Sequence, residues 1–136
     1  MEGGIVPEPN ERAGTKTVLV IDDEALFCVM AKSMLESQGY RAIISTDGAE
    51  GVKMVEEGWR KIDAVLVDLS MRPMNGRQIL TQLRHSSPST PVVMMSGSSE
   101  EDVAAANELG AFPGFLQKPF NSRTLARAIR FASAPP

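Results

Sequence analysis

Five side chains that could do chemistry come at the ends of short apolar segments of this sequence. They are Asp22 and Asp23 after the first segment, Asp68 after a later one, and Ser96 and Lys118 after two more. In open sheets of parallel strands, ligands bind beyond the carboxyl ends of the strands. If these segments are such strands, three carboxylates, one hydroxyl and one ammonium come together at a single rim.

Three carboxylates at one rim would repel one another. Two unit charges about 4 Å apart interact by about 4 kcal/mol at an effective dielectric constant of 20. Either some of the carboxyls stay protonated, with raised pKa values, or cations bind there. Lys118 can neutralise one charge, and a set of hard oxygen ligands without His or Cys suits Mg²⁺ better than Zn²⁺. The alternative, that these aspartates only cap the following helices, explains Asp22 or Asp68 singly but not the whole set.

An aspartate beside Mg²⁺ and a lysine is a plausible nucleophile toward phosphorus, and the product is an aspartyl phosphate. Mg²⁺ and the Lys118 ammonium would stabilise the charge that spreads over the phosphoryl oxygens during transfer. The Ser96 hydroxyl could donate a hydrogen bond to one of those oxygens. The pattern therefore predicts a site that accepts a phosphoryl group.

Predicted strands and helices alternate along the chain. Short runs rich in β-branched residues predict strands that are buried on both faces, as in a parallel sheet. The starts of these runs lie roughly two dozen residues apart, which leaves room for a crossover helix each time. The predicted strands are 18–21, 42–44, 64–67, 92–95 and 114–116. Together they predict a (βα)₅ fold of the α/β class, flavodoxin-like, with a doubly wound five-stranded parallel sheet and five helices on its two faces.

Apolar residues at helical spacing predict the helices between the strands. The apolar stripes are Leu26, Val29, Met30 and Met34 in the first helix, Ile79, Leu80 and Leu83 in the third, and Leu125, Ala128, Ile129 and Ala132 in the last. Gly39 is the expected stop of the first helix. Asn121 or Ser122 is the expected N-cap of the last helix, and a fourth helix is expected at about 100–109.

Length and composition fit one domain. The chain has 136 residues, of which 43% are apolar, and this is enough for one packed core. Residues 1–14 show no hydrophobic period and are interpreted as a flexible tail, residues 15–132 as the folded domain, and residues 133–136 as a second tail.

Composition also excludes several classes of protein. No stretch approaches the roughly 18 apolar residues of a membrane helix, and the first residues lack the features of a signal peptide. The single cysteine, Cys28, is expected to be a buried apolar residue, and its isolation fits a cytoplasmic protein. With 17 acidic against 14 basic residues the net charge is −3, which argues against direct nucleic-acid binding.

Four motifs resemble those of the receiver domains of two-component response regulators. They are VLVIDDE at 18–24, VDLSMRPMNG at 67–76, PVVMMSG at 91–97 and FLQKPF at 115–120. Each motif alone is weak, but four of them in order at the family's spacing are specific. The resemblance covers about residues 17–132. The wording of SGSS at 96–99 and FLQKPF at 115–120 resembles that of receivers attached to hybrid sensor kinases.

The resemblance implies a role for each residue at the rim. Asp68 would be the phosphoacceptor, and Asp23 and Asp68 would ligate Mg²⁺ directly. Asp22 would bind the metal through water, and the backbone carbonyl of Ser70 would give a further ligand.

Three further positions carry expected roles. Lys118 would pair with the Asp68 carboxylate and later with the phosphoryl group, and the peptide before Pro119 would be cis. Ser96 would be the switch hydroxyl, and Phe115 would be the switch aromatic whose ring turns inward as that hydroxyl moves.

The function that the resemblance implies is that of a signalling module and not of an enzyme. The module would take a phosphoryl group from a sensor histidine kinase or a phosphotransfer protein, and would respond by a population shift. The shift would act on the face around the fourth helix and the fifth strand, where an unknown downstream protein would bind. A homodimer stays open, although residues 110–114 lack the acidic pair that salt-bridges one common type of receiver dimer.

Two alternatives come from other functional classes. A phosphatase of the haloacid-dehalogenase type also uses an Asp nucleophile, Mg²⁺ and Lys, but it usually has a second Asp where this chain has Ser70. The chain also lacks the inserted cap region of those enzymes. A receiver-like module that binds without phosphorylation would have lost members of the rim set, which is intact here.

Overall fold

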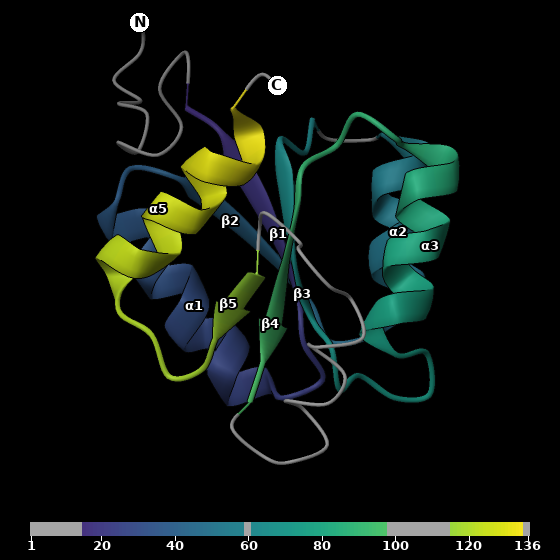
Figure 1. The fold of residues 1–136 in the computed structure, drawn as a ribbon, viewed down its shortest axis with the longest axis horizontal. Coiled ribbons are helices and arrows are strands. Elements are labelled where there is room, and N and C mark those ends of the chain that lie inside the picture. Colours follow the sequence, from purple (N-terminus) through teal and green to yellow (C-terminus); the bar gives the residue numbers. More distant parts are fainter. Residues whose placement is uncertain (1–14, 59–60, 98–114, 135–136) are drawn as a thin grey trace, which may run out of the picture.

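The computed structural model describes residues 15–58, 61–97 and 115–134, which form a parallel sheet with helices on both faces (Figure 1). The strands are β1 (Thr17–Ile21), β2 (Arg41–Ser45), β3 (Ala64–Asp68), β4 (Val92–Ser96) and β5 (Phe115–Gln117), paired in the order β2-β1-β3-β4-β5. Each predicted strand is confirmed to within one residue at either end. The strand order and parallel pairing confirm the doubly wound, flavodoxin-like fold.

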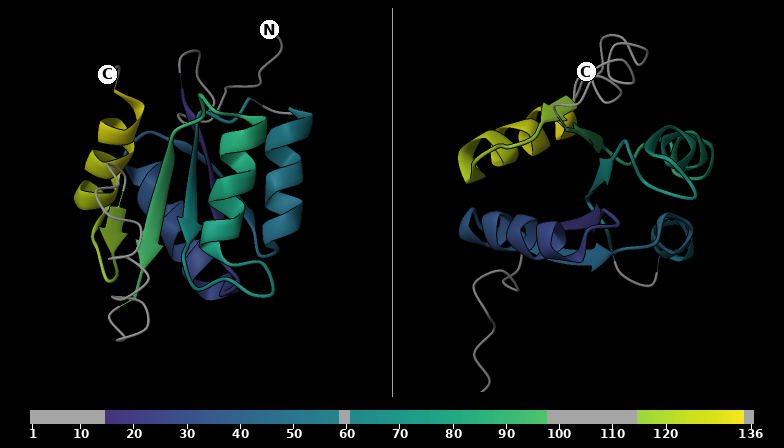
Figure 2. Two further views of the ribbon diagram at one scale, coloured as in Figure 1. Left: turned by 45° about the vertical axis from the view of Figure 1, so that its right-hand side comes forward. Right: turned by 90° about the horizontal axis from the view of Figure 1, so that it is seen from below.

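Helices cover the two faces of the sheet in pairs (Figure 2). The pair α1 (Ala25–Ser37) and α5 (Ser122–Ser133) packs on one face, and the pair α2 (Gly48–Glu57) and α3 (Gly76–Ser86) packs on the other. The predicted fourth helix at 100–109 and the predicted tail at 1–14 lie outside the described residues. Among the helices of the described part, none is long and apolar enough to cross a membrane.

The core has two layers because the sheet is buried on both sides. Successive residues of a strand point to opposite faces. In β1, Val18 and Val20 therefore pack toward α1 and α5, whereas Leu19 packs toward α2 and α3. In β4, Met95 packs toward α1 and α5, and Met94 packs toward α2 and α3. Full burial of one such side chain stabilises the fold by about 1.5–3 kcal/mol, which is why the strands are continuous apolar runs.

The apolar stripe predicted for α1 is wrong, although the helix itself is present. Leu26, Val29 and Met30 are 73%, 57% and 49% exposed, and Met34 is only partly buried. The buried residues of the helix are Cys28, Ala31 and Leu35. Both sets obey helical spacing, so periodicity cannot choose between them. The distance between packed helices depends on the side chains at the contact, and the small Cys28 and Ala31 let α1 lie close to the sheet and α5.

The ends of the helices follow the local sequence. Asn121 is the N-cap of α5, and its side-chain oxygen accepts a hydrogen bond from the Thr124 backbone N–H at 2.9 Å. Asn75 caps α3 in a reciprocal capping box with Gln78. Gly39 follows α1 with a φ of 89°, which lets the chain turn there as predicted.

Gly76 fits tightly against the backbone that follows Asp68. A Cβ at this position would lie 2.6 Å from the Leu69 Cα and 2.7 Å from the Asp68 carbonyl oxygen. The Gly76 N–H also donates to the Leu69 carbonyl at 3.0 Å. The start of α3 is therefore held against the end of β3, beside the predicted site.

We expect Gly76→Ala to lower the free energy of unfolding by about 2 kcal/mol, because the added methyl group meets backbone that cannot move aside. Gly51→Ala is the matched control. Its Cβ would meet only the Ile21 side chain, with the Cδ1 atom at 2.6 Å, and no backbone atom, so a smaller loss is expected. Urea unfolding measures both variants, and an equal loss in the two would contradict the tight fit at Gly76.

Candidate functional site

The three aspartates meet at the carboxyl ends of β1 and β3, at the lower edge of the sheet in Figure 1. Asp22, Asp23 and Asp68 each offer a carboxylate oxygen, and these oxygens lie within 4.8 Å of one another. Asp22 and Asp68 are buried, with exposed fractions of 0% and 4%, whereas Asp23 is exposed. The structure thus brings together carboxylates that are far apart in the chain, as the strand ends predicted.

Lys118 reaches this cluster from the segment between β5 and α5. Its Nζ lies 2.8 Å from Asp22 Oδ2 and 3.7 Å from Asp68 Oδ2. Its backbone N–H donates to the Ser96 carbonyl at 2.7 Å, and the peptide before Pro119 is cis, as the resemblance implies. The shorter contact is with Asp22 and not with Asp68. A carboxylate with no exposure depends most on a positive partner, since an unpaired buried charge is costly.

Asp22 also supports the start of α1. Its Oδ1 accepts a hydrogen bond from the Glu24 backbone N–H at 2.9 Å, next to the first residue of the helix. Glu24 is the N-cap of α1 and the helix has no side-chain cap hydrogen bond there, so this bond orders the turn before the helix and does not bear out the helix-capping alternative for Asp22. One carboxylate oxygen of Asp22 thus holds the turn, and the other pairs with Lys118.

Ser70 contributes its hydroxyl, which sequence reasoning missed because it considered only the backbone carbonyl of this residue. The Ser70 Oγ lies 3.2 Å and 3.1 Å from the two carboxylate oxygens of Asp68, and its N–H donates to Oδ1 at 3.3 Å. A serine two residues after an aspartate has the right reach for such a turn, so the spacing itself was the available signal.

The pKa of Asp68 is raised from its ordinary value of 3.8. Burial is the main cause, and the neighbouring charge of Asp22 adds to it. Lys118 and the hydrogen bonds from Ser70 act in the opposite direction without cancelling the rise. Ionised Asp68 is therefore disfavoured in the folded protein, and a cation bound at this corner would favour it.

Removing the Asp68 charge is expected to stabilise the metal-free protein. Protonated Asp68 contributes stability that is fully present below pH 3.8, the ordinary pKa of this group. That contribution is lost as the pH rises through the raised pKa of the folded state. Asp68→Asn should therefore raise the free energy of unfolding at pH 7 by about 1 kcal/mol, and this gain should vanish as the pH falls toward 3.8. Urea titrations in the presence of EDTA measure the effect. Glu56→Gln, which removes an exposed carboxylate, is the control, and an Asp68→Asn variant no more stable than the parent would contradict the argument.

Ser96 and Phe115 lie on the next two strands of the sheet. Ser96 follows Met95, which pairs with Asp68 across β3 and β4, and its Oγ donates to the Gly97 carbonyl at 3.1 Å. Phe115 pairs with Met94 and is partly buried in the layer toward α2 and α3. The sheet thus places both residues on the β4–β5 side of the acidic cluster.

Cys28 lies in the core next to the backbone of Asp22. Its side chain has no exposed surface, and its thiol donates to the Asp22 carbonyl with an Sγ–O distance of 3.2 Å. Burial, and then the charge of Asp22, raise the pKa of the thiol to about 11. Cys28 is therefore a buried, protonated core residue, as predicted.

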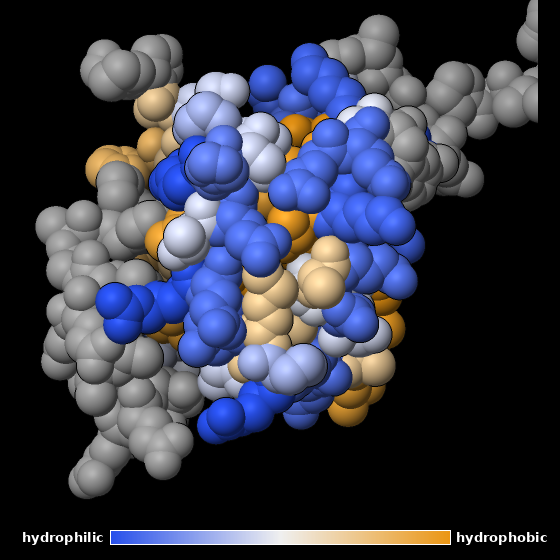
Figure 3. Space-filling view, turned by 90° about the vertical axis from the view of Figure 1, so that its right-hand side faces the viewer, coloured by the Kyte–Doolittle hydropathy of each residue, from blue (hydrophilic) through white to orange (hydrophobic). Residues whose placement is uncertain are grey.

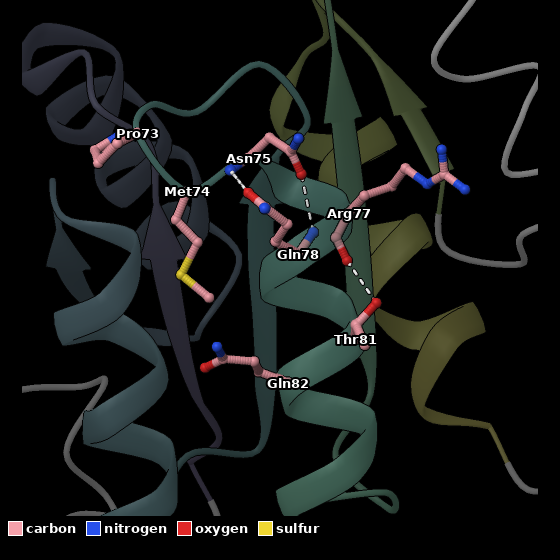
Figure 4. Close-up of a pocket in the computed structure, with 7 residues that line it drawn as sticks. All are labelled: Pro73, Met74, Asn75, Arg77, Gln78, Thr81 and Gln82. Carbon is pink, nitrogen blue, oxygen red and sulfur yellow. Dashed lines mark hydrogen bonds between the residues drawn. The ribbon is translucent and has the colours of Figure 1, made fainter.

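A separate hollow of about 700 Å³ lies along α3 (Figure 4). It is lined by Pro73, Met74, Asn75, Arg77, Gln78, Thr81 and Gln82. The polar groups of Asn75, Gln78 and Thr81 hydrogen-bond within α3 and its cap, as the dashed lines in Figure 4 show. Figure 3 shows that the surrounding face over α2 and α3 is largely hydrophilic, with apolar residues visible between the polar ones. The hollow has no carboxylate in its lining, so the acidic corner is the candidate site.

Comparison with known proteins gives a consistent result. The sequence profile of the response regulator receiver domain matches residues 18–130. The chain is 30% identical to the sensor kinase CckA of Brucella abortus over 125 residues. The aligned region covers 92% of this chain and 13% of that protein. It is 35% identical to the transcriptional regulatory protein CpxR of Escherichia coli K12 over 114 residues. This aligned region covers 83% of this chain and 47% of that protein. The chain thus spans less than half the length of these two relatives.

A solved structure agrees with the sequence comparison. The response regulator receiver domain protein of Clostridium thermocellum superposes with a TM-score of 0.75 at 30% identity. The superposition covers 87% of this chain and 94% of that one. The similarity therefore extends over nearly the whole domain and includes the strands that carry the acidic corner.

Proposed function

This chain belongs to the response regulator receiver domains, and on that premise we propose that it accepts a phosphoryl group on Asp68. The donor is a phosphohistidine of a sensor histidine kinase or of a phosphotransfer protein. The observation that carries the proposal is the acidic corner itself. Carboxylate oxygens of Asp22, Asp23 and Asp68 lie within 4.8 Å of one another, and the Lys118 ammonium lies 3.7 Å from Asp68 Oδ2.

The residues of the corner fit Mg²⁺. The donors are carboxylate oxygens, which Mg²⁺ prefers, and two of the three carboxylates are buried with only Lys118 as a neighbouring cation among the described contacts. Asp23, Asp68 and the Ser70 carbonyl would hold the ion directly, and Asp22 would hold it through water. Bound Mg²⁺ would offset the negative charge of the phosphoryl oxygens.

The transfer exchanges one bond to phosphorus for another. A carboxylate oxygen of Asp68 forms the new O–P bond, the N–P bond of the phosphohistidine breaks, and its electron pair returns to the imidazole nitrogen. Lys118 pairs with the phosphoryl group on Asp68. The Asp68 carboxyl must be ionised to attack, so a cation that lowers its raised pKa also favours the reaction.

The response to phosphorylation involves the β4–β5 side of the sheet. Ser96, whose Oγ now donates to Gly97, would donate to the phosphoryl group instead. Phe115 would turn inward as Ser96 moves. These two changes would shift the population of conformers at the face around β5, where a downstream protein, or a second copy of the domain, would bind.

A turnover phosphatase is less well supported by the same corner. Phosphatases of the haloacid-dehalogenase type need an acid two residues after the nucleophile. Here that residue is Ser70, whose hydroxyl hydrogen-bonds the Asp68 carboxylate. The domain is therefore proposed to hold its phosphoryl group for signalling and not to hydrolyse phosphomonoesters with turnover.

The test is direct phosphorylation of the chain by a small-molecule phosphoryl donor. The protein is incubated with phosphoramidate, with Mg²⁺ or with EDTA, and its intact mass is measured. We expect one added phosphoryl group that requires Mg²⁺ and is removed by hydroxylamine, as an acyl phosphate is. A chain that takes no phosphoryl group, or one that hydroxylamine cannot remove, would overturn the proposal.

A further inference from the structure

The Lys118 ammonium has a third neighbour besides the two aspartates. Its Nζ lies 3.9 Å from the centre of the Phe27 ring, over the face of that ring. On its other sides are Asp22 Oδ2 at 2.8 Å and Asp68 Oδ2 at 3.7 Å. The side chain of Lys118 is 20% exposed, so most of it is shielded from water.

The Phe27 ring is itself held in place. It makes an edge-to-face contact with Phe120, with ring centroids 5.8 Å apart and an interplanar angle of 86°. Phe27 belongs to α1 and Phe120 lies two residues beyond Lys118, and both rings pack against the core layer of α1 and α5. The helix and the segment that carries the lysine are thus joined through the two rings.

The face of an aromatic ring carries partial negative charge and attracts an ammonium group. An ammonium has three N–H donors on a flexible four-carbon stem, so its position depends on what surrounds it. Two directions are taken by carboxylates of the acidic corner and a third by the ring. The ring therefore restricts where the amine rests and keeps water from that side.

We propose that Phe27 is a positioning residue for Lys118: its ring face holds the ammonium beside Asp22 and Asp68 in the place from which it meets the phosphoryl group. This inference rests on the proposed function. The ring makes no bond to the phosphoryl group and acts only through the lysine. Its contribution depends on the electrons of the ring and not on its volume, and this difference makes the role measurable.

The first experiment changes the ring electrons at nearly constant shape. Phenylalanine analogues with one, two and three ring fluorines are incorporated at position 27 of the full chain, and the rate of labelling by phosphoramidate with Mg²⁺ is measured. Fluorine withdraws charge from the ring face, so the rate should fall stepwise, by about two- to fivefold in all. The same analogues at Phe131, which is 64% exposed on α5, are the control and should leave the rate unchanged.

The second experiment tests the contact without phosphorylation. Phe27→Leu and Lys118→Met are combined in a double-mutant cycle, and the unfolding equilibrium is measured in urea. We expect a coupling between the two changes equal to a factor of about two to five in the unfolding constant. Phe27→Tyr keeps the ring face and should retain the coupling to Lys118.

The outcomes separate the inference from the function on which it rests. A labelled parent whose rate is the same across the fluorinated series, or a cycle without coupling, would overturn the role of Phe27 alone. A parent that takes no label would overturn the proposed function, and the positioning role would fall with it.

Discussion

Asp68→Asn is expected to lower the rate of phosphoryl labelling by at least about a thousandfold, because the substitution removes the nucleophile. An amide oxygen is a far weaker nucleophile than a carboxylate. The shape of the side chain is almost unchanged, and Ser70 can still donate to the remaining oxygen, so the fold should persist. Intact-mass measurement with phosphoramidate and Mg²⁺ gives the rate in both proteins.

Residual labelling in this variant has a defined source. The Ser70 hydroxyl lies 3.1 Å from Asp68 Oδ2, and it is the nearest other nucleophile that the structure describes beside the carboxylate. A phosphoserine resists hydroxylamine, so the treatment tells the two products apart. Glu56→Gln removes a carboxylate from the exposed surface of α2 and should keep full labelling. Full, hydroxylamine-sensitive labelling of Asp68→Asn would contradict the assignment of Asp68 as phosphoacceptor.

Magnesium is expected to have the largest effect on stability. If the ion binds only the folded protein, the free energy of unfolding rises as RT ln(1 + [Mg²⁺]/Kd), or by about 2.7 kcal/mol at a hundredfold excess over Kd. The physical reason is that the ion neutralises carboxylates that the fold forces together at distances below 4.8 Å. Urea unfolding with increasing Mg²⁺ measures the rise.

Asp23→Asn should remove most of this magnesium response. Asp23 is the exposed member of the acidic corner, so its replacement takes away a proposed ligand without leaving a hole in the core. Glu56→Gln serves again as the control and should respond to Mg²⁺ as the parent does. Unfolding curves of the parent that coincide with and without Mg²⁺ would count against a metal site.

The sheet and the acidic corner could be predicted from the sequence because their causes are local. Strands buried on both faces have continuous apolar sequences, and parallel strands bring their carboxyl ends to one edge of the sheet. Asp22, Asp23 and Asp68 are the residues that follow two of those runs, so their meeting required no knowledge of side-chain packing.

The orientation of α1 could not be predicted in the same way. Two sets of apolar residues on this helix satisfy the same period, and the predicted set, which includes Leu26, Val29 and Met30, lies on the wrong face. The choice depends on how closely the helix approaches the sheet and α5, which is a property of the packed structure.

The neighbours of Lys118 were equally out of reach. The sequence predicted this residue at the rim, but its closer approach to Asp22 than to Asp68 depends on how the side chains pack in the folded protein. The contact with Phe27 joins positions 27 and 118, and only the packing of α1 beside α5 brings them together. Phe27, an aromatic residue near the start of the first helix, was the only signal in the sequence. It predicts a contact with Lys118 only once the fold is known.

The two adjacent methionines near the end of β4 make the packing of the core more adaptable there. Met94 and Met95 face opposite core layers immediately before Ser96, and Met94 pairs with Phe115 on the neighbouring strand. Unbranched thioether side chains fill irregular spaces and change shape at little cost. If Ser96 and Phe115 move as proposed, the neighbouring thioethers would take up the displaced volume, and neither layer would have to open a void.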